Sequence, residues 1–287
     1  MFGFLNVYKP KGMTSFDVVA VLRKISHIRQ IGHTGTLDPF AQGILPICIG
    51  KSTKLIEYLP HDKAYLATIQ FGARTDTYDL DGKVIEKYDK IVEEAMIQIS
   101  LKDFEGEIEQ YPPIYSALKV NGKKLYEYAR EGKEVEINPR RVNIYKIELR
   151  EFDYENQKAV VYIECSKGTY IRSIANDLGQ NLGCGGFLID LIRTKSGDFS
   201  LETSIKLNDI KTLEDIENNL LEPYDCLNLS KYELNEKEKE RVSHGIAIDG
   251  KGFISGEVVI LAYGGKIFAI GVAEENKIRI KKVFEVS

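Results

Sequence analysis

Long apolar runs are absent from this sequence, and none approaches the roughly 18 residues that a membrane-spanning helix requires. The first residues also lack the basic-then-apolar order of an export signal, because Lys9 and Lys11 interrupt the segment early. Cysteine is scarce: four cysteines are widely spaced, with no Cys-x-x-Cys pair and no cluster of histidine and cysteine. This pattern argues against structural zinc and predicts a protein of the reducing cytoplasm that makes no contact with a membrane.

An overall excess of positive charge is also lacking, since the formal net charge is −4. The charge is unevenly distributed, however. Residues 1–54 carry seven basic and two acidic side chains, residues 117–146 carry eight and four, and residues 199–240 carry five and eleven. A basic face with acids elsewhere is typical of nucleic-acid-binding proteins, although ordinary charge clustering on an enzyme gives the same counts.

One acidic residue stands out in the segment 32–43, which reads Gly-His-Thr-Gly-Thr-Leu-Asp-Pro-Phe-Ala-Gln-Gly. Pro39 disfavours a helical conformation at Asp38, so we expect an extended or turn conformation there. The three glycines let the backbone turn tightly and approach a ligand. A lone carboxylate on such a loop suits a nucleophile or base that acts on an anionic substrate. The alternative is an aspartate that caps a helix or closes a turn.

Further motifs occur in a fixed order on both sides of this loop. They are Asn6, Lys9–Ser15, Gly50–Lys54, Lys63–Tyr65, Arg74–Thr77, Tyr111–Lys119 and Cys165–Ser173. Together with the loop, this ordered set closely resembles the TruB family, the bacterial synthases that make pseudouridine at position 55 of the tRNA T-arm. The resemblance runs from Phe4 to about Phe199 and continues more weakly beyond. It implies an isomerase that uses no cofactor and no metal.

The resemblance implies an α+β fold: a central mixed, mainly antiparallel sheet with flanking helices (the pseudouridine synthase fold), plus a small C-terminal β module similar to PUA modules. We expect a catalytic domain over residues 1–225 and an RNA-binding module over 232–287. Residues 104–140 lack a sustained hydrophobic period and are expected to form an RNA-binding insertion.

Several helices and strands are predicted from local pattern. A helix is expected from Asp17 to about His27 with Ser15 as its cap, and another from Ile171 to a stop at Gly183. Further elements are expected as strands over 65–71, 142–152 and 159–165, a helix over 91–99, a helix over 236–243, and strands over 257–262, 266–273 and 277–285.

The resemblance also implies catalytic roles for three residues. Asp38 matches the catalytic aspartate of the family, and Arg172 matches the arginine that pairs with it. Tyr65 matches the tyrosine that stacks on the target uracil and assists loss of the C5 proton. Without the motif, Arg172 would be read as a solvated surface arginine. A residue such as Tyr65 is more commonly a strand aromatic in the core. The family mechanism is either attack on the ribose or base, or removal of a ribose proton to give a glycal.

Other residues match family positions that bind the substrate. His33 matches the histidine that enters the T-loop where the base was, and Tyr170 and Leu191 match residues of the uracil pocket. Lys54 is expected to steer a phosphate or support the pocket, or else to be an ordinary surface lysine. Phosphate contacts are expected from basic residues of the insertion and the following strand: Lys119, Lys123, Lys124, Arg130, Arg140 and Arg141.

Two short motifs suggest other functions but fail on inspection. Gly50-Lys51-Ser52 lacks the glycine that a phosphate-binding P-loop needs five positions earlier, where Leu45 stands. The sequence Asp79-x-Asp81-Gly82 lacks the glutamate that a calcium loop needs at its twelfth position, where Tyr88 stands. We therefore predict neither nucleotide hydrolysis nor calcium binding.

The expected partner is the T-arm of tRNA, bound by a monomer with no obligatory protein partner. Three alternatives remain open: a synthase subunit that depends on guide RNA and partner proteins, a non-catalytic RNA-folding module, and a small-molecule hydrolase that uses Asp38. The basic insertion argues against the first and the third. The second predicts that replacing Asp38 changes nothing.

Overall fold

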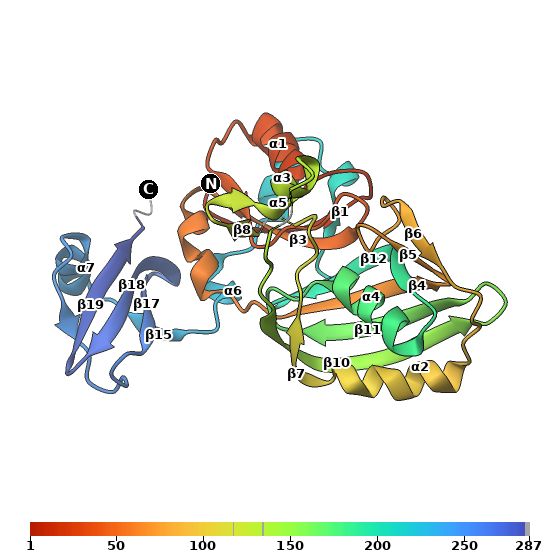
Figure 1. Ribbon diagram of the computed structural model, residues 1–287. Helices are drawn as coiled ribbons and strands as arrows, with labels where there is room; N and C mark the ends of the chain where they lie inside the picture. Colours follow the sequence, from red (N-terminus) through yellow and green to blue (C-terminus); the bar gives the residue numbers. More distant parts are fainter. Residues whose placement is uncertain (117, 134, 285–287) are drawn as a thin grey trace.

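The computed structural model describes residues 1–116, 118–133 and 135–284. Figure 1 shows a large sheet flanked by helices and a smaller sheet formed by the C-terminal segment. The predicted fold is confirmed: the large sheet is mixed and mainly antiparallel, and a small β module follows it. No helix in the described part of the chain is long and apolar enough to cross a membrane.

The large sheet has ten strands, of which eight follow the order β14-β1-β3-β12-β4-β11-β10-β7. β2 pairs with β3, and β13 pairs with β12; only the β1–β14 and β3–β12 pairs are parallel among those described. The strands are β1 (Gly3–Lys9), β2 (Ile31–His33), β3 (Gln42–Ile49), β4 (Lys63–Phe71), β7 (Gly106–Gln110), β10 (Arg140–Asp153), β11 (Lys158–Cys165), β12 (Gly186–Ser196), β13 (Phe199–Ser200) and β14 (Ile205–Lys206).

One face of this sheet packs against α2 (Glu94–Leu101) and α4 (Ile171–Leu182). Strand β11 shows why, because every second residue is buried, from Ala159 to Cys165, and the residues between them are partly exposed. Side chains alternate between the faces of a strand, so this period of two places one apolar face against the helices. Helix α4 ends as predicted at Gly183, which adopts the left-handed conformation at φ 68°.

Helix α1 (Ser15–Ser26) begins two residues before Asp17, the predicted start. Its N-cap is Thr14, not Ser15, because Thr14 and Asp17 form a capping box. Ser15 is buried instead: its hydroxyl donates to the Leu37 carbonyl at 3.1 Å and accepts from the Leu37 N–H at 2.8 Å. Ser15 therefore ties α1 to the residue that precedes Asp38.

The C-terminal module is a five-stranded sheet in the order β15-β17-β18-β19-β16 with α7 (Glu236–Ser243) beside it. Its strands are β15 (Ser230–Glu233), β16 (Ile248–Asp249), β17 (Val258–Tyr263), β18 (Lys266–Glu274) and β19 (Lys277–Val283); position 285, the predicted end of the last strand, lies outside the described residues. A shared apolar cluster joins this module to the large sheet and includes Phe4, Leu55, Ile260 and Phe284. An ion pair between Lys282 and Glu57 borders this cluster.

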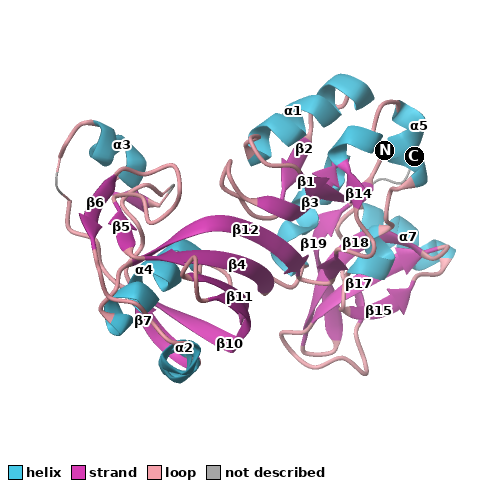
Figure 2. Cartoon of the chain, turned by 90° about the vertical axis from the view of Figure 1, so that its right-hand side faces the viewer, coloured by secondary structure: helices cyan, strands magenta, loops and turns pink. Residues whose placement is uncertain are grey.

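The predicted insertion begins and ends in the large sheet. Its first strand β7 pairs with β10, so only the segment between Gln110 and Arg140 leaves the sheet. This segment holds the short strands β8 (Lys119–Val120) and β9 (Lys123–Lys124) and the helix α3 (Leu125–Arg130). Although α3 overlaps α1 in Figure 1, Figure 2 shows that the two helices lie well apart.

The remaining elements connect these parts. They are η1 (Gly50–Tyr58), β5 (Ala73–Thr75), β6 (Val84–Lys87), η2 (Lys102–Phe104), η3 (Leu207–Asp209), α5 (Leu213–Asn218) and α6 (Pro223–Cys226).

Candidate active site

A cavity of about 940 Å³ lies where the loop that carries Asp38 meets the base of the insertion and the N-terminus of α4. Residues 34–39 line one side, and Tyr115, Leu118 and Tyr126 of the insertion line another. Strands β4 and β12 contribute Tyr65 and Leu191. The cavity therefore brings together segments that are far apart in the sequence.

Asp38 and Arg172 form an ion pair at this cavity. Arg172 Nε lies 3.0 Å from Asp38 Oδ2. The side chain of Arg172 is 7% exposed, whereas that of Asp38 is 36% exposed. The carboxylate is thus oriented by a buried cation and remains open to a ligand. The structure brings together the two residues that the family resemblance paired.

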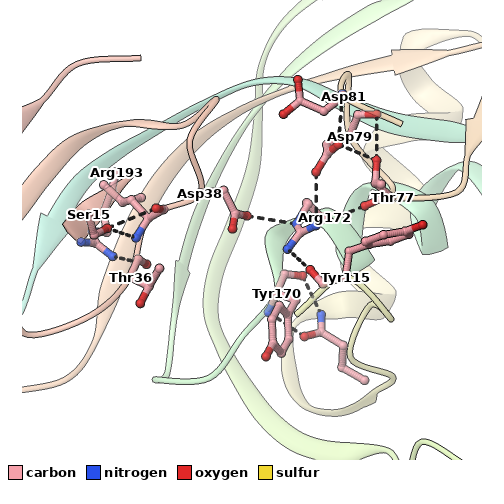
Figure 3. Close-up of polar contacts among 12 residues, drawn as sticks. Ser15, Thr36, Asp38, Thr77, Asp79, Asp81, Tyr115, Tyr170, Arg172 and Arg193 are labelled. Atoms are coloured by element: carbon pink, nitrogen blue, oxygen red, sulfur yellow. Dashed lines mark hydrogen bonds and ion pairs between the residues drawn. The ribbon is translucent and has the colours of Figure 1, made fainter. Parts of the chain in front are cut away.

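Arg172 is itself held by several acceptors, as Figure 3 shows. Its Nη1 lies 3.2 Å from Asp79 Oδ2 and 3.3 Å from the Thr77 carbonyl, and its Nη2 donates to the Tyr115 carbonyl at 3.1 Å. These contacts offset the cost of placing a cation in the first turn of a helix. Burial raises the pKa of Asp79, and the Thr77 hydroxyl and Arg172 oppose that rise.

Arg193 fixes the loop from the other side. This side chain of β12 is fully enclosed, at 1% exposure, and its nitrogens donate to the carbonyls of Ile44 at 2.6 Å, Thr36 at 3.3 Å and Gly35 at 3.0 Å. Burial lowers the pKa of Arg193, and Tyr65, to which it hydrogen-bonds, opposes this. Arg193 thus links the loop before Asp38 to Tyr65.

Tyr65 lies in β4 directly opposite Arg193 and lines the cavity. Burial raises the pKa of its hydroxyl. The ring is 8% exposed, so it forms part of the cavity wall as well as of the core. The sequence left two roles open for Tyr65, a core aromatic or a residue that contacts the substrate, and its position is compatible with both.

Tyr170 and Leu191 also line the cavity. The Gln110 side chain holds the backbone of Tyr170 at both polar groups: Oε1 accepts from Tyr170 N–H at 2.7 Å, and Nε2 donates to its carbonyl at 3.0 Å. Strand β7 therefore fixes the residue at the start of α4. Leu191 is 5% exposed and adds an apolar surface.

His33 and Lys54 do not line this cavity. His33 ends strand β2, where its Nδ1 is buried without a hydrogen-bond partner in the described part of the chain, and burial lowers its pKa. Lys54 is exposed on η1, and its carbonyl accepts from Lys282 Nζ at 3.0 Å. Lys54 therefore lies beside the C-terminal module rather than beside Asp38.

The predicted phosphate-binding residues lie outside the cavity, on the insertion and the start of β10. Lys123 pairs with Glu131 and lies 5.0 Å from the centre of the Tyr128 ring. The Lys124 ammonium lies 5.3 Å from the centre of the Tyr126 ring. The other positions are Lys119, exposed on β8; Arg140, exposed at the start of β10; Arg141, paired with Glu107 at 3.3 Å; and Arg130, whose side chain lies outside the described part.

Sequence patterns did not mark four residues as members of the site: Asp79, Arg193, Lys63 and Gln110. In the sequence, Asp79 appeared only as part of a failed calcium motif. Its position before Asp81-Gly82 gave no sign that it would meet Arg172, because that contact spans 93 residues of sequence. Within residues 1–116, 118–133 and 135–284, no group of three or more His, Cys, Asp or Glu side chains is placed to hold a metal.

Comparison with known families identifies the chain. The model of the TruB family pseudouridylate synthase N-terminal domain matches residues 23–171, and that of the tRNA pseudouridylate synthase B C-terminal domain matches residues 172–227. The chain belongs to the TruB family.

Relatives of this TruB-family chain match it along almost its whole length. The tRNA pseudouridine synthase B of Caldanaerobacter subterraneus subsp. tengcongensis is 44% identical over 98% of this chain and 99% of the relative. That of Clostridium novyi is 42% identical over 99% of each chain. Among solved structures, a chain in a Cbf5-Nop10-Gar1 complex matches with a TM-score of 0.74 and 28% identity over 99% of this chain and 85% of that one.

Proposed function

We propose that this TruB-family chain converts uridine 55 in the T-loop of tRNA to pseudouridine. The names of its full-length relatives support tRNA as the substrate and isomerisation of uridine as the reaction. A solved relative bound to a substrate RNA containing 2′-deoxyuridine, at 26% identity and a TM-score of 0.71, supports an RNA substrate for this fold.

The reaction is an isomerisation that needs neither oxidant nor energy source. The bond between uracil N1 and ribose C1′ breaks, the base turns, and C5 bonds to C1′. The proton on C5 is lost, and N1 gains one, so the atoms balance. The target base is stacked in the RNA, so the enzyme must first flip it out, at a cost of about a few kcal/mol.

The observation that carries the proposal is the Asp38–Arg172 pair at the cavity. Arg172 orients the carboxylate, and the exposed fraction of Asp38 leaves an oxygen accessible to a flipped nucleotide. Asp38 drives cleavage of the N1–C1′ bond, either by attack on the ribose or base, or by removal of a ribose proton. Hydrogen bonds to Asp79, Thr77 and Tyr115 keep the Arg172 guanidinium in position for this step.

The cavity walls supply the remaining roles. Tyr65 stacks on the uracil and assists loss of the C5 proton; burial raises the pKa of its hydroxyl, so the hydroxyl is protonated at neutral pH. Tyr170 and Leu191 enclose the base. His33 fills the space that the base leaves in the T-loop, and Lys54, beside the C-terminal module, contacts a phosphate of the RNA.

Affinity for the RNA comes from the exposed basic residues of the insertion and β10. They are Lys119, Lys123, Lys124, Arg130, Arg140 and Arg141, and their phosphate contacts make binding salt-dependent. Residues 1–225 form the catalytic domain with its insertion at about 104–140, and residues 232–287 form the RNA-binding module. The protein works as a monomer. Its location is the cytoplasm, and its four free cysteines are consistent with a reducing compartment.

The test is tritium release from an unmodified tRNA transcript labelled at C5 of its uridines. The protein alone, without guide RNA or partner proteins, should release label equivalent to one uridine per tRNA. A transcript with cytidine at position 55 should release none. Release from that transcript, or activity only with added guide RNA, would contradict the proposal.

A further inference from the structure

Positive charge exceeds negative charge in the wall of the cavity. Among the described lining residues, Asp38 is the one acid, against the cations Lys63, Lys167, Arg172 and Arg193. Arg172 is committed to Asp38 and Asp79, and Arg193 to backbone carbonyls. Neither Lys63 nor Lys167 forms an ion pair with a carboxylate among the described residues, although the nearby Asp62 raises the pKa of Lys63 and Lys167 is exposed to solvent.

Lys63 is an unusual lysine because it is buried, at 9% exposure, at the first position of β4. Its ammonium donates to the Ser196 hydroxyl at 2.8 Å, and no described carboxylate forms an ion pair with it. Burial, together with the charge of Arg193, lowers its pKa from 10.5 to about 8. Lys63 therefore stays largely protonated at neutral pH. The charge of Asp62 opposes this lowering of the pKa without forming an ion pair with Lys63. A buried ammonium without a paired carboxylate costs free energy, so a functional reason for it is expected.

His61 and Lys167 lie on the same wall. Both line the cavity. Burial lowers the pKa of His61, the charges of Lys167 and Lys63 lower it further, and Asp62 opposes the shift. The Lys63 side chain also lies close to Gly35, in the loop that leads to Asp38. A Cβ atom built on Gly35 would be 3.7 Å from Lys63 Cε. The three basic side chains thus converge at one side of the cavity, near the loop that carries Asp38.

We infer that Lys63, with His61 and Lys167, forms a subsite for one of the two phosphates that flank the flipped uridine. This inference rests on the proposed function, because it assumes that a nucleotide of an RNA strand enters the cavity. Uracil is uncharged, so the group of the RNA that would pair with the two lysines is a backbone phosphate. A lysine ammonium suits a phosphate as a point charge, and Ser196 fixes its position.

This subsite is separate from the basic residues of the insertion. None of Lys119, Lys123 or Lys124 lines the cavity, and Lys123 is already engaged with Glu131. The exposed residues provide general affinity for the RNA, whereas Lys63 recognises a phosphate only after the nucleotide has left the helical stack. Lys63 would therefore favour the flipped state over the stacked one.

The experiment measures binding of a T-arm stem-loop in the Asp38→Asn background, which prevents turnover during the measurement. Three further RNAs each carry one neutral methylphosphonate: on the 5′ side of the target uridine, on its 3′ side, or in the distal stem. Lys63→Met keeps the side-chain volume and removes the charge. We expect Lys63→Met to weaken binding roughly tenfold and to reduce the slope of log affinity against log salt by about 0.7–0.9, the value for one phosphate contact.

The deciding result is coupling between protein and RNA changes. One of the two flanking methylphosphonates should weaken binding by the parent protein and should have no further effect on Lys63→Met. Lys63→Arg should retain the effect. Lys195→Met is the matched control: Lys195 is on the neighbouring strand β12, pairs with Glu164 and does not line the cavity.

If Lys63→Met fails to fold, the exposed Lys167→Met carries the same test and should show partial coupling to the same phosphate. Unchanged affinity of the folded variants, or independent losses for both flanking phosphates, would overturn the inference. The tritium assay on the wild-type protein tests the proposed function independently of these binding measurements. Coupling without any pseudouridine formation would reject the proposed function and leave the phosphate site in place.

Discussion

Asp38 and Asp79 share one guanidinium. Arg172 reaches Asp38 with Nε at 3.0 Å and Asp79 with Nη1 at 3.2 Å, so a buried carboxylate lies behind the arginine and a partly exposed one lies in front of it. The buried acid fixes the arginine, and the arginine fixes the acid at the cavity. This chain of contacts explains how a single loop aspartate can be held in a defined orientation.

Replacing Arg172 with lysine should break this chain. An ammonium group is a point charge and cannot serve both carboxylates in the planar geometry that the guanidinium provides. We expect kcat to fall roughly 100-fold, as when an oriented acid–base group is lost. We expect stability to fall by about 1–3 kcal/mol, because lysine keeps the charge but cannot make all the hydrogen bonds that Arg172 makes to Asp79 and to the Thr77 and Tyr115 carbonyls. Single-turnover kinetics and urea unfolding measure the two effects. Arg150→Lys, at an exposed position paired with Glu148, should change neither.

Asp79→Asn tests the acid behind the arginine. Asparagine keeps the size of the side chain but leaves Arg172 with one carboxylate, so the arginine should position Asp38 less well. We expect kcat to fall about tenfold, equivalent to about 1.4 kcal/mol in the transition state, with RNA affinity unchanged. The exposed neighbour Asp81 provides the control, and Asp81→Asn should behave as wild type. Equal activity of the two variants would show that Asp79 has no positioning role.

Gly43→Ala tests the packing of β3 on β12. Gly43 has φ 109°, and a Cβ there would collide with the backbone of Arg193. We expect a loss of about 3 kcal/mol or more and a fall in Tm of roughly 6–12 °C, since both backbone strain and a rigid contact oppose the change. Gly12→Ala is the control, because Gly12 has φ 81° but open space around it, and it should cost only about 1 kcal/mol.

The lowered pKa of Lys63 makes stability depend on pH. The folded protein releases this proton near pH 8, whereas the unfolded chain holds it to about pH 10.5. In the window between those values the unfolded state binds more protons, so the free energy of unfolding should rise with pH. The gain attributable to Lys63 is on the order of 3 kcal/mol over the full window. Denaturant unfolding at pH 7.5 and 9.5 should show a smaller rise for Lys63→Met, and parallel pH profiles would contradict this assignment.

Local chemistry made much of the fold predictable from the sequence. Period-two burial in β11, the left-handed stop at Gly183 and the helix Glu236–Ser243 all depend on neighbouring residues, and each agrees with its prediction. The predicted cap of α1 was wrong because Thr14 and Ser15 are equally good capping residues. Only the tertiary contact with Leu37, which buries Ser15, decides between them.

The candidate site was predictable only in part. The pairing of Asp38 with Arg172 came from family resemblance, and geometry agrees with it. Asp79 and Arg193 were missed because their partners lie 93 and about 150 residues away, and no local pattern marks such contacts. Lys63 was noticed only as part of a motif, since a lysine at the start of a strand is ordinarily exposed and its burial depends on β12.

The most direct test of the central claim is the pseudouridine content of an unmodified T-arm stem-loop after incubation with purified protein alone. Wild type should convert one uridine per stem-loop. Asp38→Asn should bind the RNA with similar affinity and convert it at least roughly a thousandfold more slowly, because the group that drives bond cleavage is lost. Equal conversion by the two proteins, or tight binding with no conversion by either, would contradict the account.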